Sequence, residues 1–174
     1  MSRYPTIYAG QRITGTLLQS TIADEYYKVT NTDRTSTTTF ADDPDLTTTL
    51  EANAVYRVAF YLHYAAMAAA GFKTLWTVPA GASGNRSAIG PEQGVTLALT
   101  SGSGGTGRLG VHAYATTVTY GTRDHATNQA WALEESIITT SSAGTLAVQW
   151  AQATSNATAT RLAAGSSLVV RRLA

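Results

Sequence analysis

The feature of this sequence that most restricts its fold is a strict alternation of bulky side chains between residues 55 and 64. The alternating residues are Tyr56, Val58, Phe60, Leu62 and Tyr64. Successive side chains of an extended strand point to opposite faces, so this period of two predicts a strand with these five residues in a core. The other face carries Arg57, Ala59, Tyr61 and His63. That mixed face suits solvent or a subunit contact better than a second dry core.

Shorter segments of the same kind follow, separated by turn residues. Strands are expected over 72–78, 95–99, 111–120, 131–138, 145–150 and 167–173, with a helical turn over 65–70 and a glycine-rich turn over 101–107. Together with Tyr56, Val58, Phe60 and Leu62, the expected core contains Trp76, Leu146, Val148 and Trp150. About eight to ten strands at this spacing predict an all-β fold, a two-sheet jelly-roll sandwich. Threonine, roughly one residue in six, favours strands over helices.

The first residues differ from the rest and predict an arm. Residues 1–22 are assigned to this N-terminal attachment arm and residues 23–174 to the jelly-roll head domain. Within the arm, residues 7–13 predict a strand and residues 16–20 a single helical turn. Its apolar side chains are Ile7, Tyr8, Ile13, Leu17 and Leu18. They need a surface to cover them, either on the same domain or on a neighbouring subunit.

Charge and cysteine content exclude several classes of function. Twelve Lys and Arg balance eleven Asp and Glu, and the cations are scattered, so no basic stripe exists to bind nucleic acid. No stretch approaches the length of an apolar membrane-spanning helix, and no leader-like apolar segment begins the chain, which predicts a protein made in the cytoplasm with no membrane partner. The absence of cysteine rules out disulfides and thiolate chemistry. Stability is expected to come from packing and from oligomerisation.

A search for reactive groups yields weak candidates only. Asp42, Asp43 and Asp45 flank a proline and form the sharpest acidic cluster, for which a solvated turn is favoured over a calcium site because the spacing and glycine of an EF-hand loop are missing. Glu134 and Glu135 are expected on opposite faces of a strand. The three histidines, His63, His112 and His125, share no metal-ligand spacing. Asp124 beside His125 does not predict a catalytic pair, so we expect no enzyme, no metal and no cofactor.

Several runs of the sequence resemble a known group of proteins. The run 50–58 followed by 73–81, and the closing pattern 144–152, 155–160 and 164–168, resemble structural proteins of phages and prophages of actinobacteria, as does the opening 8–14. Such proteins are similar in strand order to the trimeric jelly-roll heads of the complement and tumour-necrosis-factor type, which implies a homotrimer. Segments 81–94 and 121–129 are expected to be loops and match no part of this pattern.

These observations lead to one main hypothesis and two rivals. The main hypothesis is a trimeric surface component of a virion, either a capsid decoration or a minor tail protein or fibre head, attached to capsid or tail proteins through its arm. The first rival is a tail-fibre module whose loops recognise a host-surface glycan or cell-wall polymer. The second is a hydrolase of cell-wall polymer that would use Glu134 or Asp124, and it is disfavoured because no carboxylate pair or nucleophile stands out.

Overall fold

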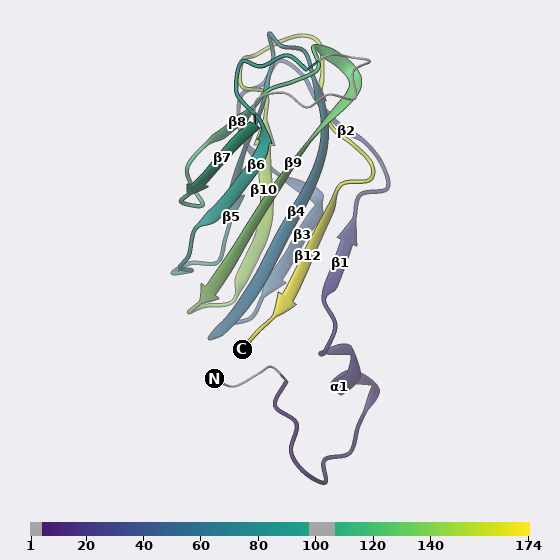
Figure 1. Cartoon of the computed structure of the whole chain (residues 1–174), viewed down its shortest axis with the longest axis vertical. Coiled ribbons are helices and arrows are strands. Elements are labelled where there is room, and N and C mark those ends of the chain that lie inside the picture. Colours follow the sequence, from purple (N-terminus) through teal and green to yellow (C-terminus); the bar gives the residue numbers. More distant parts are fainter. Residues whose placement is uncertain (1–4, 98–106) are drawn as a thin grey trace.

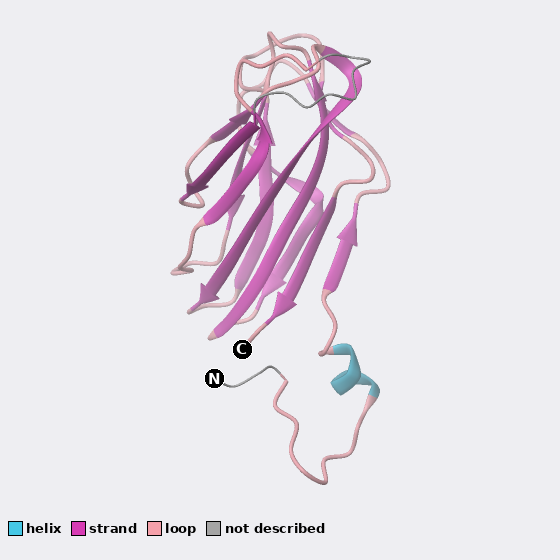
Figure 2. Cartoon of the chain, viewed as in Figure 1, coloured by secondary structure: helices cyan, strands magenta, loops and turns pink. Residues whose placement is uncertain are grey.

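The computed structural model of the chain describes residues 5–97 and 107–174, which form two antiparallel β-sheets packed face to face (Figure 1). In the described residues nearly all regular structure is strand, and the helix is confined to the N-terminal segment (Figure 2). The elements are α1 (Gly15–Gln19), β1 (Asp24–Tyr27), β2 (Thr32–Arg34), β3 (Ala41–Leu50), β4 (Ala54–Ala66), β5 (Phe72–Thr77), β6 (Arg86–Pro91), β7 (Gly107–His112), β8 (Val118–Tyr120), β9 (His125–Thr140), β10 (Gly144–Ala151), β11 (Thr160–Leu162) and β12 (Ser167–Arg172).

The order of the strands is that of a jelly roll. The large sheet runs β1-β12-β4-β9-β6-β7, with β11 paired to β4 and to β2, and the small sheet runs β3-β10-β5-β8. Four pairs each join a strand from the first half of the chain to a strand from the second half: β1 with β12, β3 with β10, β4 with β9, and β5 with β8. This is the pairing of one long hairpin that has been rolled into two sheets. The hairpin β6–β7 is inserted at its tip and widens the large sheet.

The core lies between the two sheets. Along β4, residues of even number from 54 to 66 are buried, and the long pairing of β4 with β9 holds that alternation in register over most of both strands. The eight side chains that the sequence assigned to the core are buried in this layer: Tyr56, Val58, Phe60, Leu62, Trp76, Leu146, Val148 and Trp150. Aromatic rings interlock across it, with Phe60 edge-on to Trp76 at 4.8 Å between ring centroids.

Two segments of the sandwich differ from the sequence prediction. Residues 86–91 were expected in a loop and instead form β6, which pairs with β9 and β7. The segment looked like a turn because it holds Gly90 and Pro91, but Gly90 is required for packing: a Cβ there would lie 2.8 Å from the ring of Tyr120. Residues 111–120, expected as one strand, contain the end of β7, a turn closed by the Thr116 N–H and the Ala113 carbonyl, and β8.

Further predictions were wrong at the connections. Residues 95–97 form no strand; Thr96 makes only an isolated bridge to Thr122. Leu99 and residues 101–106 of the predicted glycine-rich turn lie outside the described residues. The helical turn expected over 65–70 is replaced by the end of β4 and a turn in which the amides of Ala70 and Gly71 both donate to the Met67 carbonyl.

The N-terminal segment extends from one end of the sandwich (Figure 1). The helical turn predicted near residue 16 is α1, whose N-cap Thr14 accepts a hydrogen bond from the Leu17 amide at 3.2 Å. Residues 7–13 form no strand, contrary to the prediction, because no neighbouring strand is present to pair with them. The segment contains a turn instead, in which the Gln11 amide donates to the Tyr8 carbonyl and the Tyr8 amide donates to Oε1 of Gln11.

Replacement of a core residue tests the packing of the two sheets. Leu62→Ala removes a buried side chain from the middle of β4 and is expected to lower the free energy of unfolding by about 2–5 kcal/mol. Leu18→Ala, a matched change in the exposed helix α1, is expected to change it by no more than about 0.5 kcal/mol. Urea unfolding followed by circular dichroism measures both. Equal effects of the two substitutions would contradict the described layer.

Candidate functional site

The outer face of the large sheet carries a row of side chains that crosses the whole sheet. Cross-strand pairing connects each member to the next, in the order Tyr27, Ser167, Tyr61, Leu133, Ile89 and Leu109. Paired residues point to the same face of a sheet, so these side chains form one line. Phe60 and Leu62, the neighbours of Tyr61 along β4, are buried against the small sheet, so the row points outward. We call this line, with Trp131 and Val111 beside it, the outer row.

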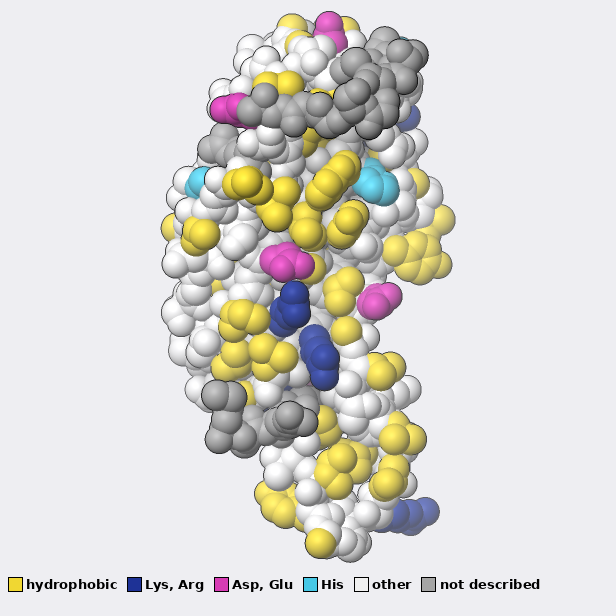
Figure 3. All heavy atoms as spheres, in the orientation of Figure 1, with side chains coloured by type: hydrophobic (Ala, Val, Ile, Leu, Met, Phe, Trp, Pro, Cys, Tyr) yellow, Lys and Arg dark blue, Asp and Glu magenta, His cyan; other side chains and the backbone are white. Residues whose placement is uncertain are grey.

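The outer row is apolar and open to solvent in the isolated chain. Leu109 and Val111 at the β7 edge are 76% and 69% exposed. Figure 3 views the molecule from the side of this face and shows hydrophobic side chains gathered over the strands of the large sheet, with charged side chains next to them. Large contiguous apolar patches are uncommon on soluble monomers and mark sites where another molecule binds.

A pair of aromatic rings lies in the centre of this face. Tyr61 on β4 and Trp131 on β9 stack at 5.8 Å between ring centroids with an interplanar angle of 9°, and each is 45% exposed. His63, which pairs with Trp131 across the strands, stands edge-on to Tyr61. Large rings that are partly exposed and already ordered lose little conformational entropy on binding, which suits the centre of an interface.

Charged side chains border the outer row on one side. Arg57 on β4 lies 3.6 Å from Glu135 on β9 between Nη2 and Oε2. Arg171 on β12 is directly opposite Arg57 in the register, so two exposed guanidinium groups meet one carboxylate. Like charges placed opposite each other destabilise a sheet unless another group neutralises them. This border would therefore favour a partner surface that brings a carboxylate.

Glu134, the candidate acid of the hydrolase hypothesis, lies inside the sandwich and not on its surface. Its side chain is fully buried and accepts hydrogen bonds from the Thr74 hydroxyl, the Trp76 indole N–H and the Tyr120 hydroxyl, and it forms an ion pair with the buried Arg86. Burial raises the pKa of Tyr120, and the charge of Glu134 raises it further, so the phenol stays a donor. All contacts of this carboxylate tie strands together, and none is open to a substrate.

Glu134 and Glu135 do lie on opposite faces of β9, as predicted. The ion pair with Arg86 was not predicted from the sequence, because Arg86 lies in segment 81–94, which was expected to be a loop. No residue pattern around it predicts a buried ion pair, since a single arginine among small residues is typical of an exposed turn.

Asp124 and His125, the other reactive candidates, are exposed and have different partners. The Asp124 carboxylate accepts from the Ala68 amide at 2.8 Å, and Nδ1 of His125 accepts from the Thr127 amide at 3.1 Å. The Asp124 carboxylate therefore ties its loop to the segment that follows β4, whereas the His125 ring closes a local turn. Neither is directed at the other, and no catalytic pair forms from them.

The acidic cluster at residues 42–45 is part of a strand, so the solvated turn predicted there was wrong. The segment belongs to β3, an edge strand of the small sheet, where Pro44 is tolerated because an edge leaves some amides without ladder partners. Asp43 is fully buried and, together with Asp45, is paired to Lys28. The positive charge that the cluster faces is therefore supplied by the chain itself. Lys28 was missed because it lies far from the cluster in sequence.

The predicted arm residues lie outside the two sheets. The exposed ones are Ile7, Tyr8, Ile13 and Leu18, while Leu17 is half-buried. The four exposed side chains are therefore open to solvent in the isolated chain. Among the residues that the structure describes, no three His, Cys, Asp or Glu side chains gather in a way that could hold a metal ion. No helix in the described ranges is long and apolar enough to cross a membrane.

The buried ion pair generates a prediction about stability. Glu134→Ala leaves the Arg86 guanidinium buried without its counter-charge and is expected to lower the free energy of unfolding by about 3–5 kcal/mol. Glu135→Ala, one residue further and on the outer face, removes only a solvent-screened pair and is expected to cost about 1 kcal/mol or less. Urea unfolding of both variants at one chain concentration gives the comparison. A Glu134→Ala variant as stable as Glu135→Ala would show that the pair does not hold the sandwich.

Comparison with known proteins adds two likenesses in structure. The chain is similar to the tripod from the baseplate of bacteriophage Tuc2009, with a TM-score of 0.38 and 8% identity over 99% of this chain and 75% of that chain. It is also similar to a chain in the structure of infectious bursal disease virus, Gx strain, with a TM-score of 0.21 and 10% identity over 99% of this chain and 41% of the other. No protein-family model and no curated protein matches the sequence. The jelly-roll assignment rests on the strand order of this chain.

Proposed function

We propose that this protein is a non-enzymatic structural component of a phage particle that assembles as a homotrimer through the outer face of its large sheet. The observation that carries the proposal is the outer row, a mainly apolar line on a sheet whose opposite face is already filled by the core. The phage assignment draws on the resemblance of runs 50–58, 73–81 and 144–152 to phage structural proteins. Within a virion, such a trimer would serve as capsid decoration or as a tail or fibre head.

Other copies of the same chain are the occupants that suit this face best. The chain carries a formal net charge of only +1, so identical copies repel each other weakly. The Arg57–Arg171 border calls for a carboxylate, and Glu25, exposed on the outermost strand β1 of the same sheet, is available on each copy. Burial stabilises by about 25 cal/mol per Å² of apolar area, so a large interface of this composition can dominate stability.

The arm supports attachment to the particle. The side chains of Ile7, Tyr8, Ile13 and Leu18 are exposed, and their segment leaves one end of the sandwich (Figure 1). In the proposed assembly, the arms (residues 1–22) bind capsid or tail proteins, and the heads (residues 23–174) project from the surface. Each set of exposed apolar side chains then has a partner. The sister copies cover the outer row of the sheet, and the particle covers the arm.

A second candidate function is recognition of a host-surface glycan or cell-wall polymer. The observation in its favour is the exposed, stacked pair Tyr61 and Trp131, because sugars pack against aromatic faces. In a trimer these rings are covered, so the two functions compete for one surface. Binding of the purified protein to host cell walls, lost in Trp131→Ala, would favour recognition over assembly.

A charge placed in the outer row tests the trimer. The unaltered protein is expected to have three times the chain mass by native mass spectrometry and light scattering at micromolar concentration. Ile89→Asp places a carboxylate within the row, next to its β7 end. The carboxylate must lose its water in the interface, so the variant is expected to give monomers that remain folded by circular dichroism. Ile7→Asp makes the same change in the arm and is expected to leave the trimer intact. An unaltered protein that stays monomeric at this concentration would contradict the proposal.

A further inference from the structure

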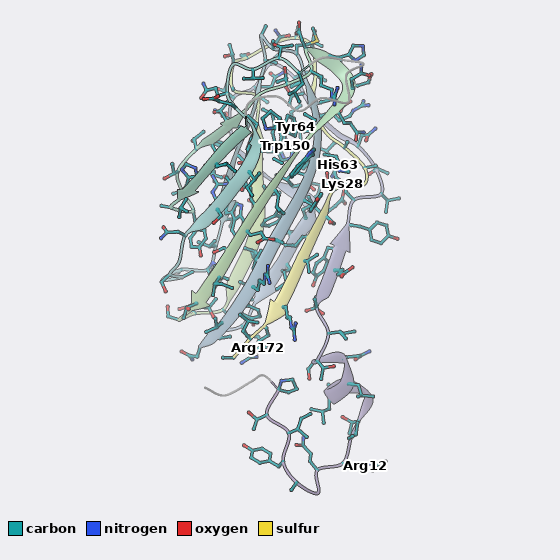
Figure 4. All side chains as sticks on the ribbon, in the orientation of Figure 1. Arg12, Lys28, His63, Tyr64, Trp150 and Arg172 are labelled. Atoms are coloured by element: carbon teal, nitrogen blue, oxygen red, sulfur yellow. The ribbon has the colours of Figure 1, made fainter. Side chains whose placement is uncertain are left out.

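A lysine and two aspartates meet inside the sandwich at the point where β1 ends. Lys28 follows β1, and its amide donates to the Ser166 carbonyl at 2.8 Å, which holds the residue beside the large sheet. Its Nζ lies 3.0 Å from Oδ1 of Asp43 and 2.6 Å from Oδ2 of Asp45, both on β3 of the small sheet. The side chains of Lys28 and Asp43 are fully buried, whereas Asp45 reaches the surface. Figure 4 shows Lys28 and Trp150 in the same upper region of the sandwich.

The Asp43 carboxyl group is surrounded by hydrogen-bond donors. Its Oδ1 accepts from the backbone amides of Asp45 at 3.1 Å and Leu46 at 3.2 Å, and its Oδ2 accepts from the Trp150 indole N–H at 3.2 Å. Donors held on both oxygens withdraw electron density from the carboxyl carbon. They also stabilise the negative charge that an attack on this carbon places on oxygen, as an oxyanion hole does.

We propose that Lys28 and Asp43 join in an amide bond that covalently connects the two sheets. Asp45 takes a proton from the Lys28 ammonium, and the free amine attacks the carboxyl carbon of Asp43. One carbon–oxygen bond then breaks, and that oxygen leaves as water with two hydrogens that came from Nζ. Ammonium and carboxylate are thereby converted into a neutral amide and one water molecule, Asp45 ends unchanged, and no oxidant or cofactor takes part.

The site satisfies the conditions that this condensation requires. The reacting groups are already in contact, which replaces a bimolecular encounter by an intramolecular one. The closed environment excludes the water that would reverse the step, and the product removes two buried charges whose desolvation is costly. The Asp45 carboxylate contacts the Lys28 amine and also reaches the surface, so it can transfer protons between the buried amine and solvent. The chain has no cysteine, so this amide would supply the covalent cross-link that a disulfide cannot supply here.

The mass of the denatured full-length protein tests the proposal directly. The unaltered chain is expected to be lighter by one water molecule than its sequence predicts, and Lys28→Met and Asp43→Ala are expected to have their full sequence masses. Trypsin cannot cut after an acylated lysine, so residues 13–34 should be released joined to residues 35–57 as one branched product. Because the mass is read on the unfolded chain of the unaltered protein, the result does not depend on whether a variant folds or whether the protein forms trimers.

Substitution of Asp45 and of its neighbour Asp42, each by asparagine, distinguishes the proposed proton-acceptor role of Asp45 from a general effect of removing a negative charge. Asp45→Asn removes the proton acceptor and is expected to slow the loss of water at least tenfold in freshly made protein. Asp42→Asn alters an exposed carboxylate of the same strand that bonds Thr77 instead, and is expected to leave the loss of water unchanged. A folded, unaltered protein with its full sequence mass and a separate 29–34 peptide would overturn the proposal and leave an ordinary buried ion pair.

Discussion

The pairing of β4 with β9 is the contact on which the rest of the sandwich depends. The two strands run side by side from the Ala54–Thr140 pair to the Tyr64–Ala130 pair, and every other pair points into the core. The remaining pairs point outward and include Tyr61 with Leu133. A shift of one residue would exchange the two faces, so the same register that fills the core also creates the outer row. Fold and proposed assembly therefore share one cause, the register of β4 with β9.

Polar groups inside the sandwich hold the two sheets at fixed positions. Glu134 on the large sheet is bonded to Thr74 and Trp76 on the small sheet, and Lys28 beside β1 is bonded to Asp43 on β3. These contacts are directional, whereas the aromatic core around them is tolerant of small shifts. In a chain without cysteine they are the contacts that can determine the relative position of the sheets. A covalent bond at the second of them would make that position permanent.

The sequence predicted those parts of the structure that follow from a period of two. The strand around Phe60 and the buried positions of Leu146 and Trp150 follow from alternation alone, and so does the separation of Glu134 from Glu135. Prediction failed where pairing between distant segments decides the conformation. Gly90 and Pro91 are typical of a loop, yet pairing with β7 holds them in a strand. Lys28 meets Asp43 only because the jelly roll brings β1 near β3. The outer row spans residues 27 to 167, and only the portion on β4 was visible beforehand.

The environment of Trp131 offers the most direct test of the claim that sister copies cover this sheet. The chain has three tryptophans, and Trp76 and Trp150 are buried in the core, so the difference in fluorescence between the unaltered protein and Trp131→Phe isolates the residue on the outer face. Acrylamide quenching of that component should be weak in the unaltered protein at micromolar concentration and strong when Ile89→Asp is also present. Equal quenching of Trp131 with and without Ile89→Asp would show that no other copy covers the large sheet.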